Sequence, residues 1–423
     1  MKKVVITGMS LMSILANDKK GHQDIIKLDQ MPENKFPISY WDNYFDGEVG
    51  SIPFFEPKEF IKNPKSIKFM SRQTILGCTA VAQVIRDAEI DDNQLQKKQF
   101  ENSLIWGAGV SDSIFPLLPA VIDCIRDDGC IDYKSLGEDG YRNLPPLWIL
   151  KKLPNTTAGQ ISVQNCIRGL NYTVVNGPLS GILAFSMAFE HIQSCRSNFT
   201  ICGAAEERTH SDYIYYLKEK GVISLSTNGL MPFDEQSDGG YIAEGASAFI
   251  LEDEDSACER GARVYAQVLA CSNRYLPHFT DSGYEYAALK FEKCMRTALE
   301  NAGITAEDID FIQTSACGDK RLDFPEALAI RSIFGNKVPI TSCSSYSGYT
   351  LGASGVVSLS YAIMQMEQNL VLPMRKTENK FLEDELNYVV ERLQRHKNNY
   401  VLINSFSYMG DACSVVLKRG GVK

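Results

Sequence analysis

The fold is indicated most clearly by a segment near the middle of the chain, Asn171-Tyr-Thr-Val-Val-Asn-Gly-Pro-Leu-Ser-Gly181. An apolar segment, Ile182–Ile192, follows it directly. The run before the glycine suits a β-strand, the Asn-Gly-Pro group is typical of a tight turn, and a helix that is apolar almost all round belongs in a core. This stretch therefore predicts a strand, a tight turn and a buried helix.

The same order recurs late in the chain. Val338–Ser345 leads through Tyr346–Ser354 into an apolar segment, Val356–Met366. The closing segments also match, because Tyr241–Leu251 and Ser407–Leu417 are each a glycine turn followed by a strand of small and apolar residues. Strand-like runs alternate with helix-length segments throughout, which predicts an α/β fold with parallel strands. We expect a duplication, with one half at residues 1–252 and the other at residues 253–423.

The composition of the chain excludes several classes of protein. The chain has 423 residues, of which 44% are hydrophobic and 22% charged, and these globular values exclude a disordered or fibrous protein. The net charge of −9 argues against a nucleic-acid partner. The twelve cysteines show no CxxC spacing and the histidines number five, so we expect no metal site and no cofactor. Free buried thiols indicate a reducing cytoplasm.

Two apolar stretches imitate targeting or membrane segments. Val4–Ala16 follows two lysines as in a signal peptide, but Thr7, Gly8 and Ser10 interrupt it. We expect instead a first strand, Val4–Thr7, that ends at Gly8. Val338–Met366 carries no charge but is rich in Ser, Gly, Tyr and Thr, which predicts a buried strand, loop and helix rather than a membrane span.

Several motifs, each weak alone, occur in an order that resembles the β-ketoacyl synthases. They are Leu153–Ser162, Met231–Gly239, Glu244–Ala246 with Leu251 and Glu252, Asp323–Ala327, Leu351–Ala353 and Asn404–Phe406. The resemblance extends from Val4 to about Lys418. It implies the thiolase fold, a duplicated five-layer αβαβα architecture, with a two-fold dimer and a long acyl pocket that reaches the dimer interface.

The resemblance also implies a reaction whose groups are replaced here. In the family, a cysteine thiolate at a helix N-terminus takes the acyl chain, two histidines and a lysine assist, and two backbone N–H groups form the oxyanion hole. The matching positions hold Pro178 for the cysteine, Ser315 and Tyr349 for the histidines, and Ser344 for the lysine. Proline also lacks the N–H of the oxyanion hole, although it suits the start of a helix. We therefore expect no catalytic residue at these positions.

This pattern is similar to the chain-length factors, also called ketosynthase β, of type II polyketide synthases. Those subunits lack the cysteine and pair with an active ketosynthase, so the resemblance implies a heterodimer and an acyl carrier protein as partners. Many of them carry glutamine at the nucleophile position, which has been linked to decarboxylative priming. Pro178 departs from that pattern, so no decarboxylase role is expected.

The resemblance places a substrate tunnel at Ser111, Ile114 and Leu118, whose spacing puts them on one helical face. The alternative for Ile114 and Leu118 is ordinary interface packing. Tyr408 occupies the position of a gatekeeping phenylalanine and is expected to fill the vacant pocket. Met409 replaces a glycine there, which indicates a loop that no longer swings.

A basic cluster lies early in the chain, in the region where ketosynthases hold the acidic carrier protein. It comprises Lys58, Lys62, Lys65, Lys68 and Arg72. We expect Lys62, Lys65 and Lys68 to dock the carrier protein, the alternative being a solvated helix face.

Other readings of these residues stay open. Ser315, Ser344 and Tyr349 would form a new catalytic set if an acid or base lay beside them, and the sequence places none there. Cys317 and Cys343 flank the pocket and are expected to be buried thiols without an activating partner. Two alternative functions are a diverged acyltransferase or decarboxylase that acts alone, and a homodimeric scaffold that binds acyl carrier protein.

Overall fold

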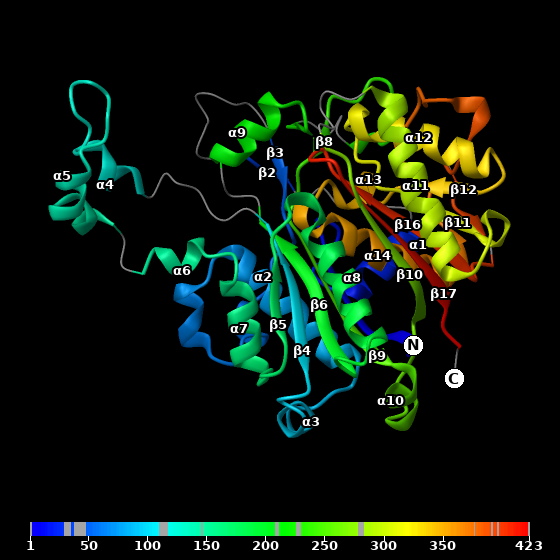
Figure 1. Cartoon of the computed structure of the whole chain (residues 1–423), viewed down its shortest axis with the longest axis horizontal. Coiled ribbons are helices and arrows are strands. Elements are labelled where there is room, and N and C mark those ends of the chain that lie inside the picture. The colour runs from blue at the N-terminus through cyan, green and yellow to red at the C-terminus, as the bar shows by residue number, and fades with distance from the viewer. Residues whose placement is uncertain are drawn as a thin grey trace.

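The computed structural model describes residues 2–28, 35–37, 48–109, 117–144, 147–207, 211–225, 230–277, 283–375, 377–390, 392–395 and 397–421. Within these residues, eleven strands form one mixed sheet at the centre of the molecule (Figure 1). In order across the sheet they are β14 (Asn387–Tyr388), β12 (Pro339–Thr341), β11 (Phe311–Gln313), β16 (Tyr400–Phe406), β17 (Asp411–Arg419), β10 (Ala266–Tyr275), β1 (Val4–Met12), β9 (Gly245–Asp253), β6 (Phe199–Glu206), β4 (Ser103–Ala108) and β5 (Asn171–Val174). Short strands pair separately as β2 (Lys35–Pro37) with β3 (Glu48–Gly50), β7 (Ile223–Ser224) with β8 (Gly240–Tyr241), and β13 (Leu370–Val371) with β15 (Gln394–Arg395).

The large sheet contains the same strand order twice. From one edge inward it runs β5-β4-β6-β9-β1, and from the other side, after β14, it runs β12-β11-β16-β17-β10. The two series meet where β1 pairs with β10. The expected parallel pairing holds for β4 with β5 and β6, and for β11 with β12 and β16. The strands nearer the centre are antiparallel, so the sheet is mixed.

The described helices cover both faces of this sheet. They are α1 (Lys19–Leu28), α2 (Arg72–Asp87), α3 (Asp92–Lys97), α4 (Leu118–Ile122), α5 (Tyr133–Glu138), α6 (Ile149–Lys152), α7 (Thr156–Asn165), α8 (Ser180–Gln193), α9 (Ser211–Glu219), α10 (Glu254–Glu259), α11 (Tyr284–Ala302), α12 (Lys320–Phe334), α13 (Ser344–Ser347) and α14 (Ser354–Gln368). Short 3-10 turns include η1 (Pro57–Glu59), η2 (Pro64–Phe69), η4 (Gly140–Asn143), η5 (Gly177–Leu179), η8 (Ala306–Asp308), η9 (Leu351–Ala353) and η10 (Glu383–Glu385).

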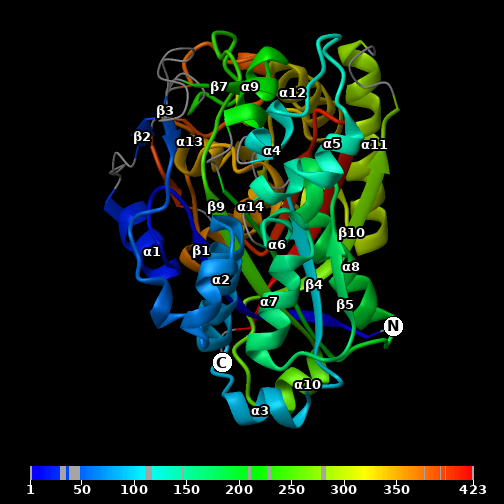
Figure 2. The same ribbon diagram turned by 90° about the vertical axis from the view of Figure 1, so that its left-hand side faces the viewer.

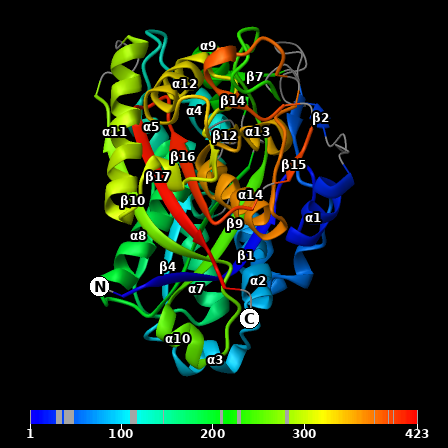
Figure 3. The ribbon, with the colours of Figure 1, turned by 90° about the vertical axis from the view of Figure 1, so that its right-hand side faces the viewer.

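Helices α8 and α14 form the middle layer, between the two halves of the sheet. Helix α8 packs on β4 and β6, α14 packs on β9 and β16, and the two helices contact each other. They approach closely because a Cβ on Gly355 would lie 2.6 Å from Cβ of Ile182. Helices α2 and α7 cover one outer face (Figure 2), and α11 and α12 cover the other (Figure 3). The predicted five-layer thiolase fold and the two predicted buried helices are confirmed.

The first strand is longer than the sequence predicted. Strand β1 runs from Val4 to Met12, through Gly8 rather than ending there, and it lies between β9 and β10. The pairing with β9 shifts register between Ile6 and Gly8. A Cβ on Gly8 would lie 2.9 Å from Cβ of Ala88, so this glycine lets the end of α2 pack on the strand. Gly8 thus marks a bulge and a close contact, not a strand end.

The uncharged stretch Val338–Met366 folds as predicted into β12, α13 and α14. Its residues are almost all buried in the protein core. In the parts of the chain that the structure describes, we find no helix with the length and apolar character needed to cross a membrane.

One segment extends away from the sheet. Residues 117–144, which we call the arm, contain α4 and α5 and lie apart from the main body in Figure 1. Helix α4 contacts η4, which belongs to the same arm. The arm exposes several large apolar side chains, among them Ile122, Tyr133 and Tyr141.

Candidate functional site

The four positions that the sequence analysis matched to the family's catalytic residues meet in one cavity. Pro178 lies in η5 at the start of α8, Ser315 follows β11, and Ser344 and Tyr349 belong to α13 and the loop after it. All four line a cavity of about 30 Å³, together with Cys317, Cys343 and Phe406 from the second half of the chain. This volume holds a small group of atoms and not an extended acyl chain.

The turn at Pro178 keeps its shape without a nucleophile. Gly177 has φ of +51°, a left-handed conformation that favours glycine. The Ser180 hydroxyl accepts the N–H of Asn176 at 2.9 Å and donates to the carbonyl of Gly177 at 2.8 Å. Pro178 itself is buried and has no N–H to donate. Local hydrogen bonds therefore preserve the turn, and residue 178 offers neither a sulfur nor an oxyanion donor.

The sequence analysis was wrong that no acid or base lies beside Ser315. The Ser315 hydroxyl donates to Glu326 at 2.8 Å, and the Ser315 N–H lies 3.1 Å from both carboxylate oxygens. Asn404 donates its side-chain N–H to the same carboxylate at 2.9 Å, and Ser414 in turn donates to Asn404. Burial raises the pKa of Glu326 to about 7, against the lowering effect of these hydrogen bonds. The prediction failed because the partner comes from α12, eleven residues further along the chain.

A second buried carboxylate holds the same loop. Asp323 accepts the N–H groups of Cys317 at 3.0 Å, Gly318 at 2.9 Å and Phe233 at 2.9 Å. Burial raises the pKa of Asp323 to about 7, although each of these bonds lowers it. Asp323 and Glu326 stand one turn apart on α12, so one helix face fixes the loop that carries Ser315. The sequence analysis used the motif Asp323–Ala327 only as evidence of the family resemblance. The spacing of its two acids could have revealed that both hold the same loop, because residues three apart lie on one helix face.

The remaining two positions carry no charge. Ser344 donates its hydroxyl to the carbonyl of Ala316 at 2.7 Å, and Ser342 donates to the same carbonyl at 2.6 Å. Ser344, at the position matched to the family's lysine, is therefore hydrogen-bonded to the loop that follows β11. Tyr349 is buried, with 4% of its surface exposed, and its hydroxyl has no hydrogen-bond partner among the described residues.

The two cysteines beside the cavity have the properties of inert thiols. Burial raises the pKa of Cys343 to about 11 and raises the pKa of Cys317 well above its ordinary value. Nearby Asp323 and Asp319 add to the shift at Cys317. A thiol attacks as the thiolate, so neither cysteine is activated at neutral pH.

Of the three residues predicted to line the tunnel, the structure describes one, Leu118. Ser111 and Ile114 fall outside the described residues. Leu118 is half-buried at the start of α4, in the arm. Tyr408 does not line the cavity; its hydroxyl lies 3.2 Å from that of Tyr213. Met409 instead covers the turn, because its sulfur would lie 2.6 Å from a Cβ on Gly177.

The three predicted docking lysines are all exposed, but they do not share a helix face. They follow the 3-10 turn η1 or lie in η2. Lys62 forms an ion pair with Asp92, and Lys68 lies over the ring of Phe69 at 4.7 Å. Arg72 does not belong with them, because it is paired with Glu244 at 2.9 Å.

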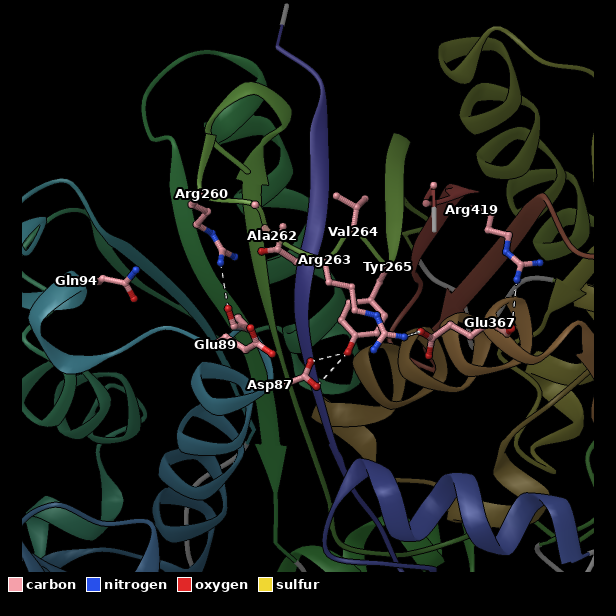
Figure 4. A pocket seen from close by; sticks show the side chains of 15 residues that line it. Asp87, Glu89, Gln94, Arg260, Ala262, Arg263, Val264, Tyr265, Glu367 and Arg419 are labelled. Atoms are coloured by element: carbon pink, nitrogen blue, oxygen red, sulfur yellow. Dashed lines mark hydrogen bonds and ion pairs between the residues drawn. The ribbon is translucent and has the colours of Figure 1, made fainter. Parts of the chain in front are cut away.

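A larger cavity lies elsewhere and differs in character. It has a volume of about 590 Å³ and is lined by the end of α2, the residues before β10 and the end of β17 (Figure 4). Its arginines already have partners within the chain: Arg260 pairs with Glu252, Arg263 pairs with Glu367, and Arg419 donates to Asn369. Among the residues the structure describes, we find no cluster of His, Cys, Asp and Glu that would hold a metal ion.

Comparisons with known proteins agree with the fold described above. Residues 1–257 match the model of the β-ketoacyl synthase N-terminal domain, and residues 265–378 match that of the β-ketoacyl synthase C-terminal domain. A 3-oxoacyl-acyl-carrier-protein synthase 2 from Rhizobium meliloti is 25% identical over 442 residues, covering 99% of both chains. A crystal structure of a β-ketoacyl synthase from Burkholderia phymatum superposes with a TM-score of 0.85 at 23% identity over all of both chains.

A further similar structure is described as the ishigamide ketosynthase/chain length factor. It superposes with a TM-score of 0.84 at 20% identity, covering 99% of this chain and 100% of that one. The two domain models together account for most of the sequence. The chain is a member of the β-ketoacyl synthase family.

Proposed function

We propose that this chain is a non-catalytic β-ketoacyl-synthase-like subunit of the chain-length-factor type. In this proposal it pairs with an active ketosynthase and shapes the tunnel for a polyketide chain bound to acyl carrier protein. Its two halves are residues 1–252 and 253–423, and it works in the cytoplasm, where its free cysteines stay reduced. The observation that carries the proposal is Pro178, which replaces the nucleophile and removes an oxyanion donor in the same turn.

The surroundings of Pro178 support the loss of catalysis. Ser315, Ser344 and Tyr349 take the places of the family's two histidines and lysine, and the cavity they share with Pro178 is small. Met409 lies against Gly177 on the approach to this turn. A condensing enzyme needs an acyl-bearing nucleophile and charged groups around it, and these positions supply neither.

The face around β5 supports a partner subunit. Strand β5 forms an edge of the sheet, and its outer side has no strand beside it within the described residues. Exposed apolar side chains lie beside this strand and on the helices next to it: Val175 after β5, Val163 on α7 and Leu153 after α6. An open strand edge bordered by apolar residues suits pairing with a second thiolase-fold subunit.

One observation bears on the acyltransferase alternative, because Ser315 and Glu326 resemble a serine with its base. The Glu326 carboxylate, however, already accepts hydrogen bonds from the Ser315 backbone and from Asn404. These donors engage both oxygens of the carboxylate, so Glu326 anchors the loop. The pair therefore favours a structural role.

The test is co-expression with the ketosynthase encoded beside this chain, followed by affinity purification. We expect a stable heterodimer whose other subunit carries a reactive cysteine and two histidines. After incubation with acyl- and malonyl-carrier protein, mass spectrometry is expected to find the acyl adduct on that subunit alone. A stoichiometric adduct on this chain, or a well-behaved monomer that ignores the ketosynthase, would overturn the proposal.

A further inference from the structure

Two buried hydroxyls that line the cavity, those of Ser358 and Tyr349, have no hydrogen-bond partner among the residues that the structure describes. Tyr349 is the larger of the two, has 4% of its surface exposed, and makes no side-chain hydrogen bond within the described parts of the chain. Its backbone is fixed, because its N–H donates to the carbonyl of Tyr241 at 2.6 Å. Burial raises the pKa of this phenol, so it stays protonated and able to donate at neutral pH. Buried polar groups are normally paired, so an unpaired phenol beside a cavity indicates an absent acceptor.

The cavity accommodates a small group that reaches it from outside. Its volume of about 30 Å³ exceeds the roughly 10–15 Å³ that one water needs. Ser315 and Ser354, which line it, keep part of their solvent exposure. Most of the remaining lining is uncharged, with Pro178 and Phe406 among the apolar members. A group of a few heavy atoms therefore fits, at the end of a longer molecule that stays outside.

The charges nearby select against an anion. No lysine or arginine lines the cavity among the residues for which the structure gives a position. Asp319, Asp323 and Glu326 lie close to its wall, and Arg321, the nearby cation, is paired with Asp319 at 2.6 Å. A carboxylate placed here would be desolvated without a counter-ion, which is strongly unfavourable. The acceptor that matches Tyr349 is therefore neutral.

We propose that this cavity is a binding subsite for a neutral carbonyl group, whose oxygen accepts a hydrogen bond from the hydroxyl of Tyr349. Pro178 provides no nucleophile, so the carbonyl is held and not attacked. An acyl or β-keto thioester fits the subsite, and a malonyl group, which ends in a carboxylate, does not. This inference depends on the proposed function in one respect, which is the delivery of the thioester by an acyl carrier protein.

The test uses S-acetyl-N-acetylcysteamine labelled with ¹³C at the thioester carbonyl. It is added to the purified chain, or to its complex with a ketosynthase whose nucleophilic cysteine is replaced by alanine. Isotope-edited infrared spectroscopy is expected to show a bound carbonyl band shifted to lower wavenumber. In Tyr349→Phe the shift is expected to vanish and the dissociation constant to rise roughly threefold to tenfold, the range for loss of one neutral hydrogen bond.

Two controls make the result specific. Tyr388→Phe also removes a buried hydroxyl, one that donates to the carbonyl of Phe381 at 2.6 Å and lies outside the cavity, and it is expected to keep the shifted band. The S-malonyl analogue is expected not to bind. An unshifted band in the wild type, or the same shift in Tyr349→Phe, would mean that water alone fills the cavity and would overturn the subsite.

Equal binding of the malonyl analogue would overturn the selection for a neutral group. The proposed function is judged separately, by co-purification of wild type and Tyr349→Phe with the ketosynthase. Intact pairing without a carbonyl shift rejects the subsite alone, and absent pairing rejects the proposed function alone.

Discussion

The hydroxyl of Ser315 donates a 2.8 Å hydrogen bond to the carboxylate of Glu326, beside the cavity that contains Pro178. Glu326 accepts hydrogen bonds from the N–H and the hydroxyl of Ser315. Asp323 accepts hydrogen bonds from the N–H groups of Cys317 and Gly318. The two acids therefore bind four donors of the loop that follows β11. The acids that remain in this site thus hold the loop in place. Their burial makes the loop's stability depend on pH.

The first prediction concerns this pH dependence. Asp323 and Glu326 have a pKa of about 7 in the folded protein, raised by burial, and ordinary values near 4 when unfolded. Between these values the folded state binds more protons than the unfolded state, so the free energy of unfolding falls as pH rises from about 4.5 to about 7. The contribution becomes constant only well above pH 7, where both groups are ionised in the folded and in the unfolded state. Urea denaturation at a series of pH values measures the slope.

Glu326→Gln is expected to reduce that slope without removing it, because Asp323 still titrates. At neutral pH it should also cost about 1–3 kcal/mol, since the amide N–H₂ meets the N–H groups of Ser315 and Asn404. Glu300→Gln, at an exposed position on α11, is the matched control and should change neither quantity. A pH slope that is identical in Glu326→Gln and wild type would show that Glu326 does not titrate in this range.

The second prediction concerns the nucleophile position. Pro178→Cys restores a thiol and a backbone N–H at the turn, while Ser315, Ser344 and Tyr349 still replace the assisting residues. We expect the variant to form no carbon–carbon bond when it is supplied with acyl- and malonyl-carrier protein. Product analysis by mass spectrometry is the measurement. Condensation by Pro178→Cys without a ketosynthase would show that this site needs no histidine or lysine.

The third prediction concerns the partner surface. Val163 on α7 is 77% exposed, so Val163→Asp leaves the chain folded but places a charge in the proposed interface. We expect affinity for the ketosynthase to fall at least about tenfold, because burial of an unpaired carboxylate is costly. Leu289→Asp on α11, where Leu289 is 61% exposed on the other outer layer, is the matched control and should pair normally. Light scattering of the co-purified complexes measures both, and equal loss of pairing in the two variants would contradict this interface.

The fourth prediction concerns carrier-protein docking. Lys65 and Lys68 are exposed, and Lys65→Glu and Lys68→Glu should each weaken binding of the acidic carrier protein about threefold to tenfold. The difference from wild type should shrink at high salt, because exposed charges are screened. Lys293→Glu, an exposed charge reversal on α11, is the control. Fluorescence anisotropy at two ionic strengths measures the effect; equal weakening by all three variants would indicate general charge attraction rather than a docking site.

The sequence predicted the fold and the meeting of the four replaced positions better than it predicted their surroundings. The strand-turn-helix segment at Gly177–Pro178 and its late counterpart are each formed by residues close together in the sequence. The buried helices α8 and α14 could therefore be predicted from the sequence pattern alone. The bond between Ser315 and Glu326 depends on how α12 packs, which no local pattern reveals. Strand β1 was predicted too short because Gly8 looks the same at a strand end and at a bulge.

The last prediction concerns product length and rests on Leu118, which begins α4 in the arm. Because the arm extends from the chain's own body, Leu118 would reach a tunnel only where a partner subunit completes it (Figure 1). Leu118→Ala removes about three carbon-sized groups and is expected to lengthen the product by roughly one two-carbon unit. Because Leu118 is half-buried, the folding cost should stay below the 2–5 kcal/mol range typical of fully buried sites.

Ser111→Phe, which fills the same tunnel in the proposal, should shorten the product. Leu136→Ala, a half-buried leucine in α5 of the same arm, is the control. The product masses of the reconstituted complex decide the matter: equal lengths from wild type, Leu118→Ala and Ser111→Phe, with the heterodimer intact, would assign these residues to interface packing.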